Sequence, residues 1–400
     1  MPTICKLNCQ FVEVMSIRFI NRELHKEMIR LKAYFPVIVL TGPRQSGKTT
    51  LSKNLFAEFH YVDMMRAADR HLIESSPEVF LKQYAKGLII DEAQYWPDLF
   101  PYVKIVADQL PNSNFILTGS NNLSLMEKVT ESLAGRAATL TLLPLSLSEL
   151  DIEQVQLPTD VLLFNGGYPA VWAKNIPASD VSRQYYNLYI ERDVRQLINV
   201  KDLSKFQIFI RLCAGRIATE FNAQSLSNEM GISHNTVSHW LSALEASYLV
   251  FRLMPFYKNM GKRLVKTPKI YFYDTAIICF LLGIETPEQL KTHPLRGAIF
   301  ENYVVLEFLK NRYHNGKSNN LLFYRDQSQR EVDLIQQFGH QYNAYEIKSA
   351  VLFHSNFTNN LNYLKNLLGD ALIKREVVYD GDSDLDATEN GVVNFRRIRM

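Results

Sequence analysis

The sequence has little cysteine, no long apolar run and almost no net charge. Its four cysteines, Cys5, Cys9, Cys213 and Cys279, are too few and too scattered among 400 residues for a disulfide framework or a four-cysteine zinc site. The most strongly apolar uncharged run, Thr275 to Ile284, has 10 residues, whereas a helix that spans a bilayer needs about 20. A formal net charge of +3 excludes long-range attraction of the whole protein to nucleic acid. We therefore expect reduced thiols, no membrane partner and a cytoplasmic location.

The composition is that of a globular protein with several domains. Apolar residues make up 47% of the chain and charged residues 21%, and 400 residues exceed the size of one ordinary core. Changes of pattern along the chain predict an N-terminal appendage at residues 1–14, an α/β domain at 15–150, a mainly helical domain at 151–290 and a further α/β domain at 291–400.

A glycine-rich loop lies between a predicted strand and a predicted helix. Pro36 to Leu40 is typical of a buried parallel strand, and Thr50 to Ala57 has the pattern of the helix that follows. The loop matches G-x-x-x-x-G-K-[ST] and consists of Gly42, Pro43, Arg44, Gln45, Ser46, Gly47, Lys48 and Thr49. In such a loop the glycines let successive N–H groups face one anion, while the lysine reaches the β and γ phosphates and the hydroxyl a magnesium ion. We expect these residues and Thr50 to bind ATP with Mg²⁺.

A second apolar strand, Leu88 to Glu92, ends in two acids. Asp91 is suited to hold the magnesium ion, and Glu92 to polarise an attacking water, which favours hydrolysis over binding alone. The alternative is a core strand that ends at a solvated turn. A further strand-like segment, Phe59 to Val62, completes a β-α-β alternation that predicts a parallel sheet covered by helices.

Two more residues are candidates for nucleotide contact. Phe115 to Thr118 is a buried strand followed by small polar residues, so Ser120 or Thr118 could sense the γ phosphate, although a plain turn fits the same residues. Arg136 precedes another strand-like run and could meet the nucleotide in cis or across the subunit boundary of a homo-oligomer. The alternative for Arg136 is a solvent-exposed side chain.

The helical region contains a predicted helix-turn-helix at Gln224 to Glu245. A turn at Gly231 is followed by a helix that Ser233 caps. Its inward stripe is Val237, Leu241 and Leu244, and its outward residues are His234, Asn235, Ser238 and His239. These polar side chains are able to touch double-stranded DNA.

A run of cations follows the strand-like segment Tyr248 to Pro255. It has five cations in twelve residues and no acid: Lys258, Lys262, Arg263, Lys266 and Lys269. The arrangement resembles the wing of a winged helix, which would lie along a phosphate backbone. The alternative is a solvated charged face, or a winged helix that serves only in packing.

Three acids and a lysine near the C-terminus suggest a second site for phosphate chemistry. If Gln337 pairs with Tyr342 in a hairpin, Asp333 lies opposite Glu346, and Lys348 shares a face with Glu346. Asp333 and Glu346 are suited to bind Mg²⁺ or Mn²⁺, and Lys348 to position water or offset charge. Glu301 interrupts a buried helical stripe and could add a ligand. The alternative is that these acids only pair with Arg325, Arg330 or Lys348 on a polar sheet face.

The ordered set of motifs resembles a large prokaryotic family of AAA-type P-loop ATPases with a C-terminal domain of unknown function. The markers are Phe35 to Leu51, Ile89 to Gln94, Leu117 to Ser120, Leu133 to Arg136, Tyr189 to Val194 with Glu191-Arg192-Asp193, and Lys266 to Asp274. The resemblance implies an AAA-type ATPase core, a winged-helix segment and a C-terminal fold similar to PD-(D/E)-x-K restriction endonucleases. This last likeness depends on Asp333 and Glu346-Ile347-Lys348, with Glu301 matching the acid that such nucleases carry on their first helix.

The expected function is a magnesium-dependent ATPase whose cycle repositions a DNA-binding, nuclease-like C-terminal half. The alternative is a nucleotide-controlled regulator in which that half only binds DNA or a protein. A third hypothesis, an AAA motor that acts on protein, would need a pore loop that the sequence does not identify.

Overall fold

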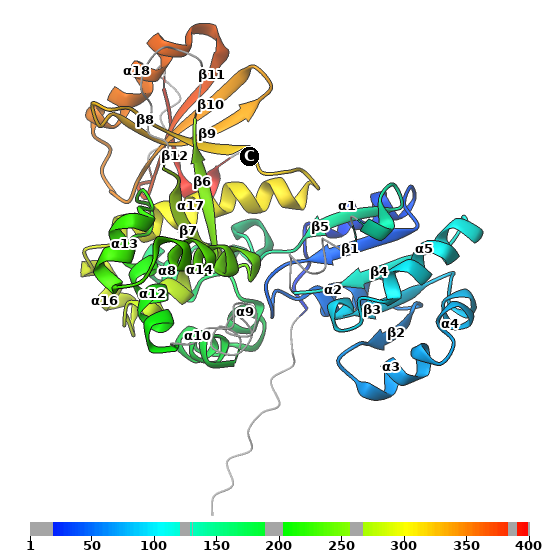
Figure 1. Cartoon of the computed structure of the whole chain (residues 1–400). Helices are drawn as coiled ribbons and strands as arrows, with labels where there is room; N and C mark the ends of the chain where they lie inside the picture. Colours follow the sequence, from blue (N-terminus) through cyan, green and yellow to red (C-terminus); the bar gives the residue numbers. More distant parts are fainter. Residues whose placement is uncertain are drawn as a thin grey trace, which may run out of the picture.

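Two β-sheets and a group of helices make up the described part of the chain (Figure 1). The computed structural model describes residues 19–120, 129, 131–188, 203–256, 267–382 and 390–398. The predicted appendage at 1–14 and the segment Glu191-Arg192-Asp193 lie outside these ranges. Within them, no helix has both the length and the apolar character needed to span a membrane.

The N-terminal sheet is parallel throughout and has the strand order β2-β3-β4-β1-β5. Its strands are β1 (Val37–Thr41), β2 (His60–Asp63), β3 (Leu88–Asp91), β4 (Phe115–Thr118) and β5 (Ala137–Thr141). Because all five strands run the same way, their carboxyl ends meet at one edge of the sheet. The predicted parallel sheet is confirmed.

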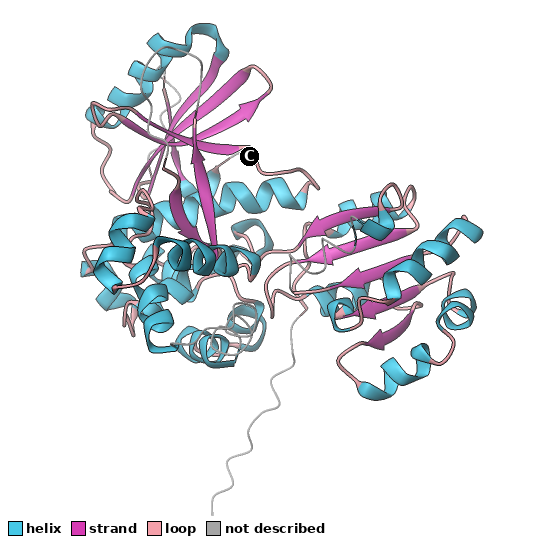
Figure 2. Ribbon diagram, in the orientation of Figure 1, coloured by secondary structure: helices cyan, strands magenta, loops and turns pink. Residues whose placement is uncertain are grey.

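Helices cover both faces of this sheet, as Figure 2 shows. They are α1 (His25–Lys32), α2 (Lys48–Leu55), α3 (Ala67–Glu74), α4 (Pro77–Gln83), η1 (Ala93–Tyr95) and α5 (Leu99–Gln109). Side chains alternate along β1, so Val37 and Val39 pack with α3, α4 and α5, whereas Ile38 and Leu40 pack with α1 and α2. Such double coverage explains why the strand is apolar at every position.

The middle region is helical. Its helices are η2 (Leu147–Glu149), α7 (Ile152–Val155), α8 (Thr159–Asn165), α9 (Pro169–Lys174), α10 (Ala178–Tyr185), α12 (Leu203–Ala214), α13 (Ala223–Met230), α14 (His234–Ala246), α15 (Thr275–Leu281) and α16 (Pro287–Thr292). The predicted turn and cap are confirmed, since Gly231 has φ 60° and the Ser233 hydroxyl accepts from the N–H of Thr236 at 3.0 Å. The inward stripe is buried, and His234, Asn235 and His239 are exposed.

The C-terminal sheet has the order β12-β11-β10-β9-β8-β6-β7. Its strands are β6 (Val250–Pro255), β7 (Lys269–Phe272), β8 (Leu321–Arg325), β9 (Glu331–Phe338), β10 (Gln341–Lys348), β11 (Leu372–Tyr379) and β12 (Gly391–Asn394). The remaining helices are α17 (Arg296–His314), η4 (Ser355–Thr358), α18 (Asn359–Leu368), η5 (Gly369–Ala371) and η6 (Phe395–Arg397). Figure 1 shows α17 and α18 on different sides of the sheet. Tyr345 packs against Phe308 of α17, and Ala344 belongs to the core that contains Leu361 of α18.

The pair β6 and β7 joins the middle region to this sheet. The two strands are antiparallel to each other, and Met254 and Pro255 of β6 pair with β8. Strand pairing therefore continues across the boundary predicted at residue 290. The winged-helix segment stays a prediction, and of its proposed wing cations Lys269, the first residue of β7, lies in this sheet.

Candidate functional site

The phosphate loop follows β1 and leads into α2, as its motif predicts. Because β1 lies beside β4 and β4 beside β3, residues that follow these strands gather at the same edge. Gly42 has φ 139°, and a Cβ atom there would lie 2.1 Å from the Leu142 carbonyl oxygen. Gly47 has φ 96°. Glycine is therefore required at both positions by backbone geometry.

Lys48 is buried within the loop, with 6% of its surface exposed. Its ammonium donates to the carbonyl oxygens of Gly42 at 2.9 Å and Pro43 at 2.8 Å. Burial lowers the pKa of Lys48 to about 8 despite the opposing charges of Glu92 and Asp91. In the ATP complex, phosphate oxygens would replace these two carbonyl oxygens as the hydrogen-bond partners of Lys48. Their negative charge would stabilise the protonated amine and so raise its pKa.

ATP affinity is expected to fall as the pH rises above about 8. Because phosphate raises the pKa of Lys48, binding takes up a proton above that pH, and the dissociation constant should rise by up to about tenfold per pH unit. Titration with a fluorescent ATP analogue between pH 7 and 10 measures this slope. Lys48→Met should bind weakly with a flat profile, and a flat wild-type profile would contradict the assignment.

Asp91 and Thr49 lie together beside the loop. The Thr49 hydroxyl donates to Oδ2 of Asp91 at 2.7 Å, and the Thr118 hydroxyl donates to Oδ1. A hydroxyl and a carboxylate are hard oxygen ligands, so this pair fits Mg²⁺, with phosphate and water oxygens completing its coordination. The Mg²⁺ would neutralise charge on the phosphates, while Asp91 and Thr49 would fix its position.

Tyr61 of β2 is a member of this site that sequence reasoning missed. Its hydroxyl donates to Oδ2 of Asp91 at 2.9 Å. Burial and the Asp91 charge raise the pKa of Tyr61, which keeps the hydroxyl protonated as a donor. Strand β2 runs parallel to β3, and Tyr61 lies two residues before its carboxyl end. A polar side chain so close to the carboxyl end of a neighbouring strand could have identified Tyr61 from the sequence.

Glu92 is held by two neighbours. Its backbone has φ 51°, and its Oε2 accepts from the side-chain amide of Gln94 and from the Ser120 hydroxyl, the latter at 3.3 Å. The structure thus brings Glu92 and Ser120 together, as expected for residues that follow neighbouring strands. Gln94 was not identified as a site residue from the sequence.

Arg136 lies at the opposite end of β1 from the phosphate loop. Its carbonyl oxygen accepts from the N–H of Val37, the first residue of β1, and its guanidinium is paired with Asp108 of α5. Five residues of strand separate it from the loop, or about 16 Å. The prediction that Arg136 contacts the nucleotide in cis is therefore wrong, and a contact across a subunit boundary stays a prediction.

The predicted hairpin brings together Asp333, Glu346 and Lys348, whereas Glu301 comes from α17. Gln337 pairs with Tyr342, which confirms the register. The backbone N–H of Ile347 donates to Oδ2 of Asp333 at 2.7 Å. We call Glu301, Asp333, Glu346 and Lys348 the acid–lysine cluster. The Lys348 ammonium lies 2.7 Å from Oε1 of Glu346 and 3.5 Å from Oδ2 of Asp333.

Glu301 has two partners from β7 that the sequence did not reveal. Its Oε1 accepts from the Lys269 ammonium at 3.0 Å and from the Tyr271 hydroxyl at 2.6 Å. Burial raises the pKa of Glu301 to about 7, although the charge of Lys269 acts in the opposite direction. Lys269 is 1% exposed and also lies 2.5 Å from Glu331. Its assignment to a DNA-contacting wing is wrong, because it is buried in ion pairs.

The cluster fits a divalent cation only in part. Oε2 of Glu346 is buried without a hydrogen-bond partner, and burial together with Asp333 raises the pKa of Glu346 to about 8. Such an orphaned oxygen suits a ligand, and Mg²⁺ often uses one or two carboxylates with water and phosphate oxygens. No group of three or more His, Cys, Asp or Glu side chains is arranged for a metal within the described ranges. The expectation of Mn²⁺ gains no separate support.

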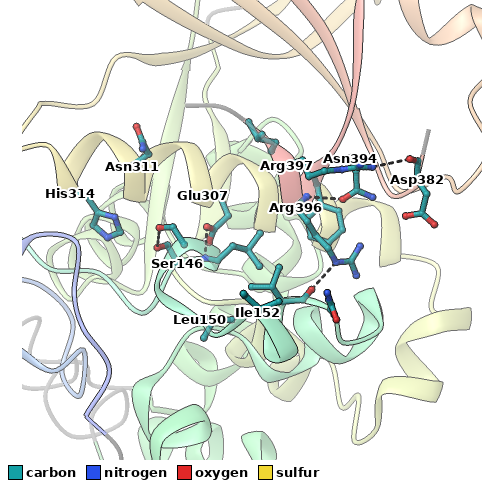
Figure 3. Close-up of a pocket in the computed structure, with 16 residues that line it drawn as sticks. Ser146, Leu150, Ile152, Glu307, Asn311, His314, Asp382, Asn394, Arg396 and Arg397 are labelled. Carbon is teal, nitrogen blue, oxygen red and sulfur yellow. Dashed lines mark hydrogen bonds between the residues drawn. The ribbon is translucent and has the colours of Figure 1, made fainter. Parts of the chain in front are cut away.

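A pocket elsewhere in the molecule contains none of the predicted site residues. It lies between α17, the segment that begins at Ser146, and the C-terminal residues around Arg396 (Figure 3). The other predicted wing cations, Lys258, Lys262, Arg263 and Lys266, lie outside the described residues.

Comparison with known families divides the chain into three parts. An AAA domain matches residues 34–151, a domain of unknown function (DUF8612) matches 159–288, and a further domain of unknown function (DUF4143) matches 296–398.

Similar proteins occur in several bacteria. The chain is 30% identical over 361 residues to the uncharacterized protein Rv2008c of Mycobacterium tuberculosis. The matched region covers 87% of this chain and 76% of the relative. The same figures hold for the uncharacterized protein Mb2031c of Mycobacterium bovis. An uncharacterized protein of Haemophilus influenzae is 24% identical over 421 residues, covering 94% of this chain and 98% of that protein.

Solved structures give more distant likenesses. The Walker-type ATPase of Pyrococcus abyssi is 15% identical with a TM-score of 0.44, covering 67% of this chain and 99% of that chain. The RuvB Holliday junction branch migration motor of Thermotoga maritima is 17% identical with a TM-score of 0.30, covering 58% of this chain and 90% of that chain.

Proposed function

Because the chain belongs to the same family as the mycobacterial proteins Rv2008c and Mb2031c and carries an AAA-type P-loop ATPase domain, we propose that it is a magnesium-dependent ATPase that acts on DNA. The observation that carries the ATPase part is the meeting of Lys48, Thr49 and Asp91 at one sheet edge. Lys48 would hold the β and γ phosphates, and Thr49 with Asp91 would fix Mg²⁺ between them. Glu92 would orient the attacking water and accept its proton.

We propose further that the C-terminal half binds double-stranded DNA and cleaves it. Support comes from the acid–lysine cluster, where two carboxylates and an amine converge and one buried carboxylate oxygen has no hydrogen-bond partner. Asp333 and Glu346 would hold Mg²⁺ against a phosphodiester, and Lys348 would offset the charge that develops on phosphate. The resemblance to PD-(D/E)-x-K nucleases agrees with this arrangement.

A regulator without nuclease activity is the second candidate. The observation that favours it is internal charge pairing: Lys348 already contacts both carboxylates, and Lys269 pairs with Glu301. In that case the same half would bind DNA or a protein under control of the nucleotide. The cytoplasmic location and the homo-oligomer remain predictions.

A cleavage assay separates the two candidates. Supercoiled, linear duplex and single-stranded DNA are incubated with the full chain, ATP and Mg²⁺ or Mn²⁺, and products are separated on a gel. Nuclease activity predicts metal-dependent cleavage that Asp333→Asn and Lys348→Met each reduce by about a hundredfold or more. Glu376→Gln, which changes a carboxylate on the neighbouring strand β11, is the matched control. If the wild-type protein bound DNA but did not cleave it, the result would exclude the nuclease and support the regulator.

The DNA-binding part has its own test. Lys262→Glu combined with Arg263→Glu is expected to weaken duplex binding and to reduce the slope of log affinity against log salt by roughly two, because each lost phosphate contact removes about one unit of slope. Fluorescence anisotropy at several salt concentrations measures both quantities. Unchanged affinity would exclude these cations from DNA contact.

A further inference from the structure

Arg22 is a buried arginine that lies outside every motif of the sequence. It precedes α1 and is 4% exposed. Its guanidinium donates in three directions: to the Ser46 carbonyl at 2.6 Å, to the Leu143 carbonyl at 2.6 Å and to Oε1 of Glu149 at 3.0 Å. Ser46 belongs to the phosphate loop, so Arg22 ties the loop to the segment 143–149, which begins after β5. The planar guanidinium suits this role because its donors point in fixed directions.

Glu149 holds the other side of Arg22. Its side chain is fully buried, and it also accepts from the N–H groups of Glu23 at 2.8 Å and Ser146 at 3.0 Å. Burial acts to raise the pKa of Glu149, but the Arg22 charge and the hydrogen bonds outweigh it, so the pKa is lowered. The carboxylate is therefore ionised and firmly held at neutral pH.

The opposite side of the segment 143–149 is bound to α17. Oε2 of Glu307 accepts from the N–H of Leu147 at 2.8 Å. The Lys310 ammonium donates to the Leu145 carbonyl at 2.7 Å and to Oε1 of Glu307 at 2.8 Å. Figure 3 shows Glu307 pointing from α17 toward the backbone that carries Ser146. The segment 143–149 is thus hydrogen-bonded to Arg22 on one side and to α17 on the other.

The same helix extends to the acid–lysine cluster. Glu301 and Lys310 are nine residues apart on α17, or about 14 Å along a rigid helix. The first half of α17 therefore carries Glu301 of the cluster, and the second half contacts the segment that Arg22 joins to the phosphate loop. The contacts of Arg22 and of Lys310 in this series are buried, so displacement of one group leaves its partner unsatisfied.

We infer that Arg22 is a positioning residue for the phosphate loop, and that the segment 143–149 makes the loop's ATP affinity depend on α17. ATP binding requires the backbone around Ser46 to hold one conformation. Arg22 stabilises that conformation by donating to the Ser46 carbonyl oxygen. A change at α17 alters the anchor of the segment and hence the position of Arg22. By linkage, ATP binding stabilises the anchored arrangement of α17 by the same free energy that this arrangement adds to ATP binding.

A double-mutant cycle on ATP affinity tests this inference. Arg22→Gln and Lys310→Met are each expected to raise the dissociation constant of ATP by about fivefold or more. In the double variant the effect of Lys310→Met should largely disappear, because its route to the loop is already broken. Arg312→Gln is the control, since Arg312 lies on the same helix but donates to the Ser318 carbonyl.

The cycle is measured on the full chain by calorimetric titration with ATP and Mg²⁺, after thermal unfolding shows that each variant is folded at the assay temperature. If Arg22→Gln does not fold, Arg22→Lys keeps the charge and removes the three-way geometry, and an intermediate affinity is expected. An unchanged affinity in Lys310→Met, or effects of the two changes that simply multiply, would overturn the inference. DNA cleavage does not enter the measurement, and absence of ATP binding by wild type would instead refute the proposed function.

Discussion

Replacement of Glu92 by Gln is expected to lower ATP turnover by about 10²–10⁴-fold, the usual contribution of a general base. The reason is that Gln keeps the hydrogen bonds of the side chain but cannot take a proton from water. Glu92 lies beside Ser120 and Gln94, and its position follows that of Asp91, so its geometry should survive the change. Binding of ATP should stay within about threefold of wild type, because binding depends on Lys48 and the loop.

Phosphate release and equilibrium binding of an ATP analogue separate these two quantities. Glu58→Gln, an exposed acid of the same domain, serves as the control and should match wild type. If Glu92→Gln retained turnover within a few fold, another group would have to activate the water. If it lost binding as well, Glu92 would act through the structure of the loop.

Replacement of Lys269 by Met is expected to destabilise the protein by about 3–5 kcal/mol, because it leaves the largely buried Glu301 carboxylate without its cation. Lys269 lies 3.0 Å from Glu301 and 2.5 Å from Glu331, and its own side chain is almost completely buried. The effect should appear as a lower midpoint of urea unfolding. Joining Glu301→Gln to the substitution should restore most of the stability, since Glu301 is then uncharged and Glu331 still pairs with Arg325 at 3.1 Å.

Lys374→Met provides the matched comparison. Lys374 also lies in the C-terminal sheet and pairs with Glu376 at 2.8 Å, but its side chain is 34% exposed. Its loss should cost less than about 1 kcal/mol, as for pairs near the surface. Equal losses for Lys269→Met and Lys374→Met would show that the burial of Lys269 contributes nothing.

Local patterns predicted the strands and the loop of the candidate nucleotide site well, because these parts are short and lie at strand ends. The strand Phe115–Thr118 has the predicted bounds, and β1 and β3 differ from the prediction by a residue or two. The register of β9 and β10 could be deduced because a tight hairpin leaves few alternatives, and Gln337 does pair with Tyr342.

Long-range contacts could not be predicted in this way. Arg22 and Glu149 are separated by 127 positions, and neither lies in a motif. Lys269 was grouped with neighbouring cations because sequence alone does not show which lysine enters a core. Arg136 was placed near the nucleotide because it precedes a strand, but the parallel order of β5 and β1 puts the start of that strand at the far edge.

The rate of ATP hydrolysis with and without DNA tests the central claim most directly. Phosphate release by the full chain with Mg²⁺ is measured alone and with duplex, single-stranded and branched DNA, with Lys48→Ala as the background. The account predicts turnover that depends on Lys48 and changes by severalfold with at least one DNA. Lys48-dependent turnover that is identical under all four conditions would contradict the coupling of the nucleotide site to a DNA-binding half, and turnover unaffected by Lys48→Ala would contradict the nucleotide site itself.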